Sequence, residues 1–209
     1  MTGPPELLTA DDPRALEAAA LALRRGAIVG IPTETVYGLA VLPTAAGLER
    51  LIEAKRRSAE KGIQLLIDSI DQARSVAVLT PDAERLAALF WPGPLTLVLG
   101  RRGDLDLPEL LGGGRPTLGL RLPDHAVPRA LARLLGPIAA SSANISGQPD
   151  ATTPSQVVKS VGDVVDVVLD DGPVRGGVPS SVVACLDGQP PQVLRPGALE
   201  QELRAALRE

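Results

Sequence analysis

The sequence predicts an α/β (α+β) fold, a single domain in which helices flank one twisted, mixed β-sheet. Three observations predict it. Capped helices alternate with short apolar runs along the chain, and no internal repeat or low-complexity segment divides it. The 209 residues are ordinary in composition, 44% hydrophobic and 22% charged, so the chain can bury one sizeable core.

Helix starts are marked by a side chain that can accept hydrogen bonds from the first turn, in three cases followed by proline. Helix ends are marked by glycine or by the Trp91–Pro94 break. In chain order, the expected helices follow the Asp11–Pro13 signal over Arg14–Arg25, run from Thr44 to Lys55, run from Thr80–Pro81 to the break, cover Asp124–Leu135, begin at Thr153–Pro154, and cover Ala198–Arg208.

Apolar runs between these helices are predicted as buried strands. In chain order they are Ala27–Ile31, Ile63–Ile67, Leu95–Leu99, Thr117–Leu122, Ile138–Ser141, Val164–Leu169, Ser180–Cys185 and Gln192–Leu194. The Gly/Pro-rich stretch Gly103–Pro116 is long enough for a mobile loop. Its Gly112–Gly114 run is interpreted as flexibility, because the helix that a glycine-rich nucleotide loop requires does not follow it.

The composition excludes several classes of protein. Phe90, Trp91 and Tyr37 are the only aromatic residues, so base stacking on aromatic platforms is nearly excluded. With one cysteine, Cys185, and one histidine, His125, the chain has no internal disulfide and no Cys/His zinc cluster. Catalysis by a Ser-His-Asp or Cys-His set would have to use His125 alone.

Charge and hydropathy point to a cytoplasmic protein. The net charge of −4 argues against a surface coated with positive charge for non-specific nucleic-acid binding, although a local basic cleft is compatible with it. No apolar run approaches ~18 residues, so no membrane span is expected. The first sixteen residues have neither a basic start nor an apolar core, so they do not form a signal peptide.

Three polar strings follow predicted elements where open α/β sheets bind ligands. The first is Pro32–Leu39, which an ordinary turn with capping threonines also explains. The second, Lys55–Gly62, holds four basic residues and suits a polyanion such as a triphosphate; a helix end complemented by cations is the alternative. The third, Ser141–Gly147, can form an anion nest or simply turn the chain. No Walker motif is present.

Six strings in register carry a family resemblance. PTETVYGL, K-x-R followed by K-G-I, WPGPLTLVL, TLGLRLPDH, SSANISG and VLRPG resemble the YrdC-like family of threonylcarbamoyl-AMP synthases, from about Gly26 to Gly197. The resemblance implies a YrdC-like domain over residues 8–200 with a concave active-site cleft, an N-terminal tail over residues 1–7 and a C-terminal helix end over residues 201–209. It is the short bacterial form, without the extra C-terminal domain of longer members, that the chain resembles.

The resemblance implies an enzyme, an L-threonylcarbamoyladenylate synthase. It would make threonylcarbamoyl-AMP from L-threonine, bicarbonate or CO2, and ATP with Mg²⁺, releasing pyrophosphate. A downstream threonylcarbamoyl transferase complex would then use the product to form threonylcarbamoyladenosine in tRNA. Weak tRNA binding and no membrane association are expected. Such chemistry needs cations on the phosphates and a fixed cation for the amino-acid carboxylate.

The family's functional residues carry over to matching positions here. For threonine they are Thr35, Arg121 as the carboxylate clamp, the backbone at Ala140, and Ser180. For catalysis and ATP they are Lys55 and Arg57, and for ATP also Lys61, Thr117, Ser142, Asn144, Asp150 and Arg195. No protein ligand set for a metal is implied. An arginine that only covers a carboxylate at the sheet end is the alternative for Arg121.

The sequence departs from the family pattern at three places. Ser58 replaces the usual proline after K-x-R, Leu66 stands where many longer members have a histidine near threonine, and Pro179–Ser181 differs from their acid-Ser-Thr. Two other functions stay open. One is an RNA-binding or tRNA-maturation accessory protein of the same fold without synthase activity. The other is a carbamoyl-adenylate-forming enzyme with another acceptor, like the YrdC-like domain of hydrogenase-maturation carbamoyltransferases.

Overall fold

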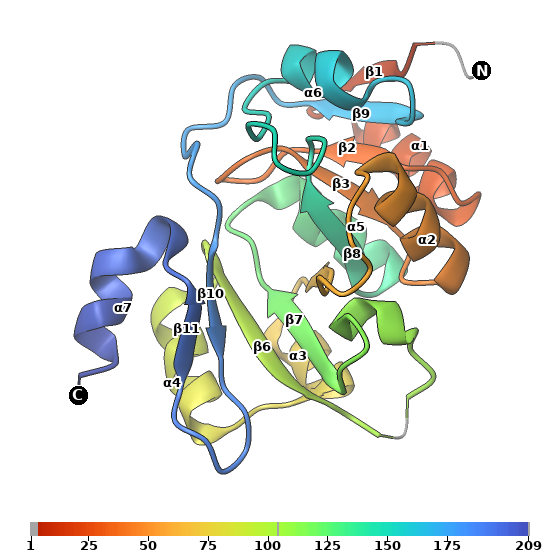
Figure 1. Ribbon diagram of the computed structural model, residues 1–209. Helices are drawn as coiled ribbons and strands as arrows, with labels where there is room; N and C mark the ends of the chain where they lie inside the picture. The colour runs from red at the N-terminus through yellow and green to blue at the C-terminus, as the bar shows by residue number, and fades with distance from the viewer. Residues whose placement is uncertain (1–3, 104, 209) are drawn as a thin grey trace.

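A computed structural model describes residues 4–103 and 105–208 and contains one mixed sheet of eleven strands with helices on both sides (Figure 1). The sheet order is β1-β9-β2-β3-β8-β4-β7-β6-β10-β11, and β5 pairs with β6. The strands are β1 (Glu6–Thr9), β2 (Val29–Ile31), β3 (Gly38–Val41), β4 (Gln64–Leu66), β5 (Ala77–Val78), β6 (Leu95–Arg101), β7 (Thr117–Arg121), β8 (Ile138–Ser142), β9 (Val167–Asp170), β10 (Ser181–Ala184) and β11 (Gln192–Arg195).

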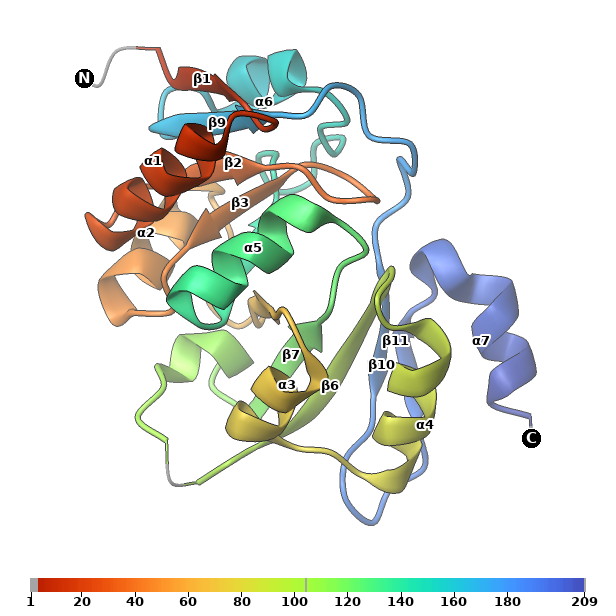
Figure 2. The ribbon, with the colours of Figure 1, turned by 180° about the vertical axis from the view of Figure 1, so that it is seen from behind.

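The helices confirm the single α/β domain predicted from the sequence. They are α1 (Pro13–Arg24), α2 (Ala45–Ala54), α3 (Ile70–Val76), α4 (Pro81–Phe90), α5 (Ala126–Leu135), α6 (Pro154–Val161) and α7 (Glu200–Ala206), with 3₁₀ turns η1 (Glu109–Gly112) and η2 (Gly197–Leu199). Within the described ranges no helix is long and apolar enough to cross a membrane. In Figure 1, α2 and α6 lie in front of the upper strands, whereas α1, α3, α4 and α5 face the viewer in Figure 2.

The predicted helix starts are confirmed by their caps. The side chains of Asp12, Thr44, Thr80 and Thr153 each accept a hydrogen bond from a backbone N–H of the first turn. Such a cap is worth about 1 kcal/mol, because the first N–H groups of a helix otherwise lack partners. The expected start at Asp124 is two residues early, since His125 is the cap of α5 and its Nδ1 accepts from the backbone N–H of Val127.

Several parts of the fold differ from the prediction. Helix α3 was not predicted, because it is short and buries only Ala73. The string Pro32–Leu39 is not all loop, since Gly38 and Leu39 belong to β3. Strand β1 lies across the expected boundary at residue 8 and pairs in parallel with β9. The closing helix begins at Glu200 after a 3₁₀ turn, not at Ala198.

Two apolar clusters hold the helices to the sheet. The larger joins α2, α6, α3, α4 and α7 to the sheet, and Leu203 and Ala206 of α7 belong to it. The smaller lies between the strands and the helices α1 and α5. Each fully buried leucine contributes about 1.5–3 kcal/mol. Helix α7 therefore packs against the rest of the domain.

Side-chain alternation in the central strands separates the core from a polar face. The register pairs Leu97 with Leu120 and Val98 with Gly119 across β6 and β7. Leu97, Leu99, Leu118 and Leu120 are all buried in the larger cluster. Because successive side chains of a strand point to opposite faces, the residues between these leucines form the other face. That face carries the candidate site.

The glycine run at residues 112–114 is packed against its neighbours, which corrects its interpretation as flexibility. A Cβ at Gly113 would lie 2.2 Å from the carbonyl oxygen of Glu60, and Gly113 has φ +63°. The backbone N–H of Ile63 also bonds to the carbonyl of Leu111 at 2.9 Å. Gly113 has no Cβ, so it allows this close approach and this backbone conformation.

Candidate active site

A cavity of about 360 Å³ lies on the polar face of the sheet. Its floor comes from six neighbouring strands, which confirms that Thr117, Gly119 and Arg121 share one face. The sheet residues that line it are Gln64, Thr96, Val98, Thr117, Gly119, Arg121, Ala140, Ser141, Ser142, Val182, Leu194 and Arg195. Loops contribute Thr35, Val36, Arg57, Gly62, Ile63, Leu111, Gly112, Arg115, Asp150, Pro179 and Ser180.

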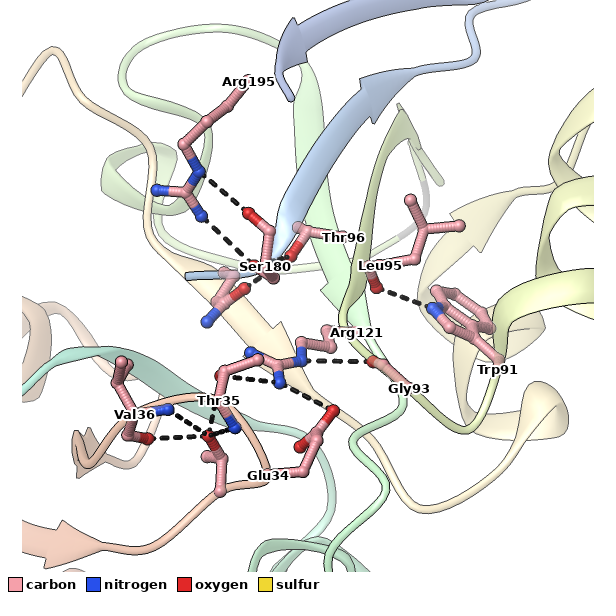
Figure 3. Close-up of polar contacts among 12 residues, drawn as sticks. Glu34, Thr35, Val36, Trp91, Gly93, Leu95, Thr96, Arg121, Ser180 and Arg195 are labelled. Carbon is pink, nitrogen blue, oxygen red and sulfur yellow. Dashed lines mark hydrogen bonds and ion pairs between the residues drawn. The ribbon is translucent and has the colours of Figure 1, made fainter. Parts of the chain in front are cut away.

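Arg121, at the end of β7, is 3% exposed and is fixed by three groups (Figure 3). Its Nη2 lies 2.8 Å from Glu34 Oε1 and donates to Thr35 Oγ1 at 3.0 Å. Its Nε donates to the carbonyl of Gly93 at 3.3 Å. Among the described residues, Nη1 has no hydrogen-bond partner. Arg121 therefore covers a carboxylate, as the structural alternative expected, and also lines the cavity. Its role as a carboxylate clamp for threonine stays a prediction.

The loop after β2 presents Thr35 to Arg121 through its own hydrogen bonds. Thr33 Oγ1 accepts from the backbone N–H groups of Thr35 and Val36, each at 3.2 Å, and donates to the Val36 carbonyl at 2.7 Å. Its single proton is thereby used, so the Thr35 hydroxyl must donate in the 2.9 Å contact between the two hydroxyls. The Thr35 oxygen then faces Arg121 as an acceptor.

Ser180 directly precedes β10 and is almost fully buried. Arg195 of β11 donates from Nε to the Ser180 carbonyl at 2.9 Å and from Nη2 to Ser180 Oγ at 3.1 Å. Ser180 Oγ also contacts Thr96 Oγ1 at 2.9 Å (Figure 3). Two expected site residues, Ser180 and Arg195, are thus joined directly, and Thr96 connects them to the floor.

Arg57 forms the cationic wall of the cavity together with Arg195. Its Nη1 donates to Ser141 Oγ at 2.9 Å and its Nη2 to the carbonyls of Lys61 and Gly62, whereas its buried Nε has no partner within the described part of the chain. Burial lowers the pKa of Arg57, and the charge of Arg195 lowers it further. Among the described residues, neither arginine has a carboxylate within ion-pair distance, although the charge of Asp150 acts on Arg195. Arginines that line a cavity without an ion-pair partner are the arrangement expected of an anion site.

Lys55 is 2% exposed and does not line the cavity. Its Nζ donates to the carbonyls of Ser142 and Asn144 and, at 2.8 Å, to Asn144 Oδ1. Burial lowers the pKa of Lys55 to about 8; the charge of Arg57 adds to this and that of Asp150 opposes it. Lys55 therefore holds the loop that follows β8. Asn144 belongs to the same hydrogen-bond network. Lys61 is exposed and does not line the cavity.

Asp150 is the only carboxylate among the described residues that line the cavity. No group of three or more His, Cys, Asp or Glu residues that could hold a metal occurs in residues 4–103 and 105–208. A resident zinc or calcium does not fit this donor set. Mg²⁺ fits it, because this ion is commonly held by one carboxylate together with the phosphates of a nucleotide.

The one histidine, the one cysteine and the one tyrosine of the chain lie elsewhere. His125 caps α5 and its Nε2 lies 3.0 Å from Asp171 Oδ2. Cys185 is buried, which raises the pKa of its thiol to about 11. Tyr37 donates from its hydroxyl to the Gly172 carbonyl at 2.8 Å, and burial raises its pKa to about 12. None of the three lines the cavity.

Several cavity residues were not predicted from the sequence. Gln64 and Thr96 are single polar residues within apolar strands, and that interruption was the available signal. Arg115 follows the glycine run, and nothing in the sequence links it to the site. The Gly93 carbonyl reaches Arg121 through the Trp91–Pro94 turn, in which Trp91 Nε1 donates to the Leu95 carbonyl at 2.7 Å.

Residues 21–197 match the Sua5/YciO/YrdC family profile, which carries the description "Telomere recombination". The chain belongs to the Sua5/YciO/YrdC family. It is 41% identical over 183 residues to the threonylcarbamoyl-AMP synthase of Pyrococcus abyssi, covering 86% of this chain and 53% of the relative. Identity to the threonylcarbamoyl-AMP synthase of Vibrio cholerae is 35% over 187 residues, covering 87% of this chain and 97% of the relative.

Solved structures of the Sua5/YciO/YrdC family share the fold. Pyrococcus abyssi Sua5 complexed with L-threonine gives a TM-score of 0.88 at 36% identity, covering 97% of this chain and 60% of that one. Escherichia coli YciO gives 0.81 at 24% identity, covering 94% of this chain and 96% of that one, a likeness of fold alone. The chain spans about half the length of the Pyrococcus abyssi and Bacillus subtilis relatives it matches.

Proposed function

We propose that this protein is a threonylcarbamoyl-AMP synthase, which makes threonylcarbamoyl-AMP from L-threonine, bicarbonate or CO2, and ATP. One observation carries the proposal. The cavity has an arginine anchored by its own carboxylate at one end, Arg121. Along its wall are two arginines, Arg57 and Arg195, with no carboxylate in ion-pair distance in the described part of the chain. The first suits an amino-acid carboxylate and the other two suit phosphates.

In this proposal, the free Nη1 of Arg121 binds the carboxylate of threonine. The hydroxyls of Thr35 and Ser180 and the backbone at Ala140 contact the rest of the amino acid. The Pyrococcus abyssi relative was solved with L-threonine, and this supports an amino-acid site in the same fold. Arg57, Arg195 and Thr117 bind ATP, with Ser142 and Asp150 beside them and Lys61 near the mouth. Lys55 and Asn144 act from behind the wall by fixing the loop after β8.

The reaction follows from this placement. The threonine amine adds to CO2 and loses a proton, which gives a carbamate. A carbamate oxygen then attacks the α-phosphorus of ATP; a P–O bond forms there while the P–O bond to the β-phosphate breaks, and pyrophosphate leaves. Arg57 and Arg195 stabilise the charge that develops on the phosphate oxygens. Mg²⁺, which Asp150 and the phosphates would hold, neutralises phosphate charge when bound.

Pyrophosphate release is the test of the proposed function. We expect release from ATP only when L-threonine, bicarbonate and Mg²⁺ are all present, and detection of threonylcarbamoyl-AMP as the product. Serine, valine and no amino acid are the comparison reactions. Equal pyrophosphate release without any amino acid would overturn the synthase proposal. The product is expected to serve a transferase complex that modifies tRNA.

A further inference from the structure

A directed chain of hydrogen bonds crosses the floor of the cavity and ends at Gln64. Arg195 can only donate, and its Nη2 lies 3.1 Å from Ser180 Oγ. Thr96 Oγ1 donates to Gln64 Oε1 at 2.8 Å, so its single proton is used there. In the 2.9 Å contact between the two hydroxyls, Ser180 is therefore the donor and Thr96 the acceptor. Each hydroxyl proton in this series of hydrogen bonds therefore has a single acceptor.

The direction of this chain fixes the amide of Gln64. Its Oε1 is turned toward Thr96, so its Nε2 carries two N–H donors away from Thr96. Within residues 4–103 and 105–208, Nε2 has no protein partner. Gln64 lines the cavity and pairs in register with Ala140, and Gly119 on the neighbouring strand has no side chain to cover it. A Cβ at Gly119 would lie only 3.7 Å from Cα and Cβ of Gln64.

Gln64 lies between the two ends of the cavity. Gly62, two residues earlier, accepts a hydrogen bond from Arg57 at 2.6 Å, and the chain through Thr96 and Ser180 leads to Arg195. Toward the other end of the cavity, Leu66 is the next residue of β4 on the same face as Gln64, and it pairs in register with Arg121. A group bound to Arg121 at one end and reacting near Arg57 at the other must pass the amide of Gln64.

We propose that Gln64 Nε2 binds an oxygen of the CO2-derived carboxylate on the substrate's amine, and that Thr96 positions the amide for it. This rests on the proposed function. In the reaction, that oxygen loses its negative charge as the carbamate becomes the carbonyl of a mixed anhydride. A neutral donor can bond to the oxygen before and after this change. A cation would favour the charged ground state and would raise the barrier.

Three variants test the role of Gln64. Gln64→Leu removes the donors, Gln64→Glu replaces them with acceptors and a charge, and Thr96→Val removes the proton that orients the amide. For both Gln64 variants we expect the KM for bicarbonate to rise about 10- to 100-fold, the loss expected for a hydrogen bond to a charged group. The KM values for threonine and ATP should change by less than about 3-fold. Thr96→Val should shift the KM for bicarbonate in the same direction by a smaller factor.

The control is Gln189→Glu, because Gln189 is exposed and its side chain has no contact with the cavity. This variant should keep all three KM values. Calorimetric titration of threonine without bicarbonate should give wild-type affinity for the Gln64 variants, and Gln64→Met serves if Gln64→Leu lowers the melting temperature. A raised KM for threonine or ATP with an unchanged KM for bicarbonate would overturn the assignment. Wild-type protein that releases no pyrophosphate would instead overturn the proposed function, and the assignment with it.

Discussion

Arg121 Nη2 and Glu34 Oε1 lie 2.8 Å apart, in an ion pair whose side chains are 3% and 20% exposed. The pair fixes the guanidinium before any ligand arrives, together with the hydrogen bond from Nε to the Gly93 carbonyl. Such a pair is a weak source of net stability, because desolvation offsets the attraction. Its effect here is to hold the side chain so that Nη1 meets a ligand with little loss of freedom.

Arg121→Lys tests this arrangement as a threonine site. Lysine keeps the charge but has one nitrogen where arginine has a planar fork, so it cannot satisfy Glu34, Thr35 and a ligand together. We expect the affinity for threonine to fall about tenfold or more, while the affinity for ATP changes little. Isothermal titration calorimetry of threonine and of ATP into the variant measures both affinities. Loss of both affinities with a lower melting temperature would mean that Arg121 holds the fold and not threonine.

Arg57→Ala tests the phosphate wall. The change removes an anion-binding fork from the place where charge develops at the α-phosphate. We expect kcat/KM to fall ~10²-fold or more, or about 2.7 kcal/mol. The adjacent Arg56 is exposed and does not line the cavity, so Arg56→Ala is the matched control and should keep the wild-type rate. A wild-type rate for Arg57→Ala would instead support the alternative that Lys55–Gly62 is only a solvated helix end.

Lys55 supports a prediction about pH. Its pKa is lowered from 10.5 to about 8 in the folded protein, so between these values the unfolded chain binds more protons at this residue. Stability from this group therefore increases as pH rises from about 8 to 10.5. Lys55→Met removes this dependence. We expect the difference in free energy of unfolding, wild type minus variant, to grow over that range in denaturant titrations at several pH values; a constant difference would contradict it.

Lys55 also shows what the sequence could and could not predict. The string Lys55–Gly62 was recognisable as a cationic segment, and Arg57 does reach the cavity. Whether each cation faces the ligand or the protein depends on which carbonyls surround it. Ser142 and Asn144 come from β8 and the loop after it, which adjoin Lys55 only after the sheet has formed. Sequence periodicity carries no information about such distant contacts.

The face of β7 was predictable for the opposite reason. Alternation within one strand is a local property, so Thr117, Gly119 and Arg121 could be assigned together to the ligand side. Gln64 and Thr96 also follow this alternation, but each is a single polar residue in an apolar run and has no partner nearby in the sequence. Their hydrogen bond joins β4 to β6, across β7, and depends on the sheet order.

RNA binding is expected to be weak. The net charge is −4, and the arginines identified here point into a cavity instead of spreading over a surface. We expect tRNA affinity to fall steeply as salt rises, because a few phosphate contacts account for it. Fluorescence anisotropy with labelled tRNA at several salt concentrations measures this. Tight, salt-resistant binding by protein that forms no adenylate would favour the RNA-binding accessory protein over the synthase.

The segment over residues 171–180 crosses from β9 to β10 and borders the loop after β2 that carries Thr35 (Figure 1). The backbone N–H of Gly177 bonds to the Thr35 carbonyl at 2.7 Å. A Cβ at Gly176 would lie 2.6 Å from the carbonyl oxygen of Glu34 and 2.9 Å from Thr35 Cα. These are backbone atoms, so an added methyl group must displace the loop that presents Thr35 to Arg121.

Gly176→Ala is therefore expected to raise the KM for threonine about tenfold and to leave the KM for ATP within about 2-fold. Arg195 bonds to the far end of this segment, at Ser180, and Arg57 bonds to Ser141, Lys61 and Gly62. The neighbouring Arg175 is exposed, so Arg175→Ala tests the same backbone without added volume and should behave as wild type. Pyrophosphate release measured over separate threonine and ATP titrations distinguishes the two effects. If Gly176→Ala keeps the wild-type KM for threonine, the geometry of the loop at Thr35 does not control threonine binding.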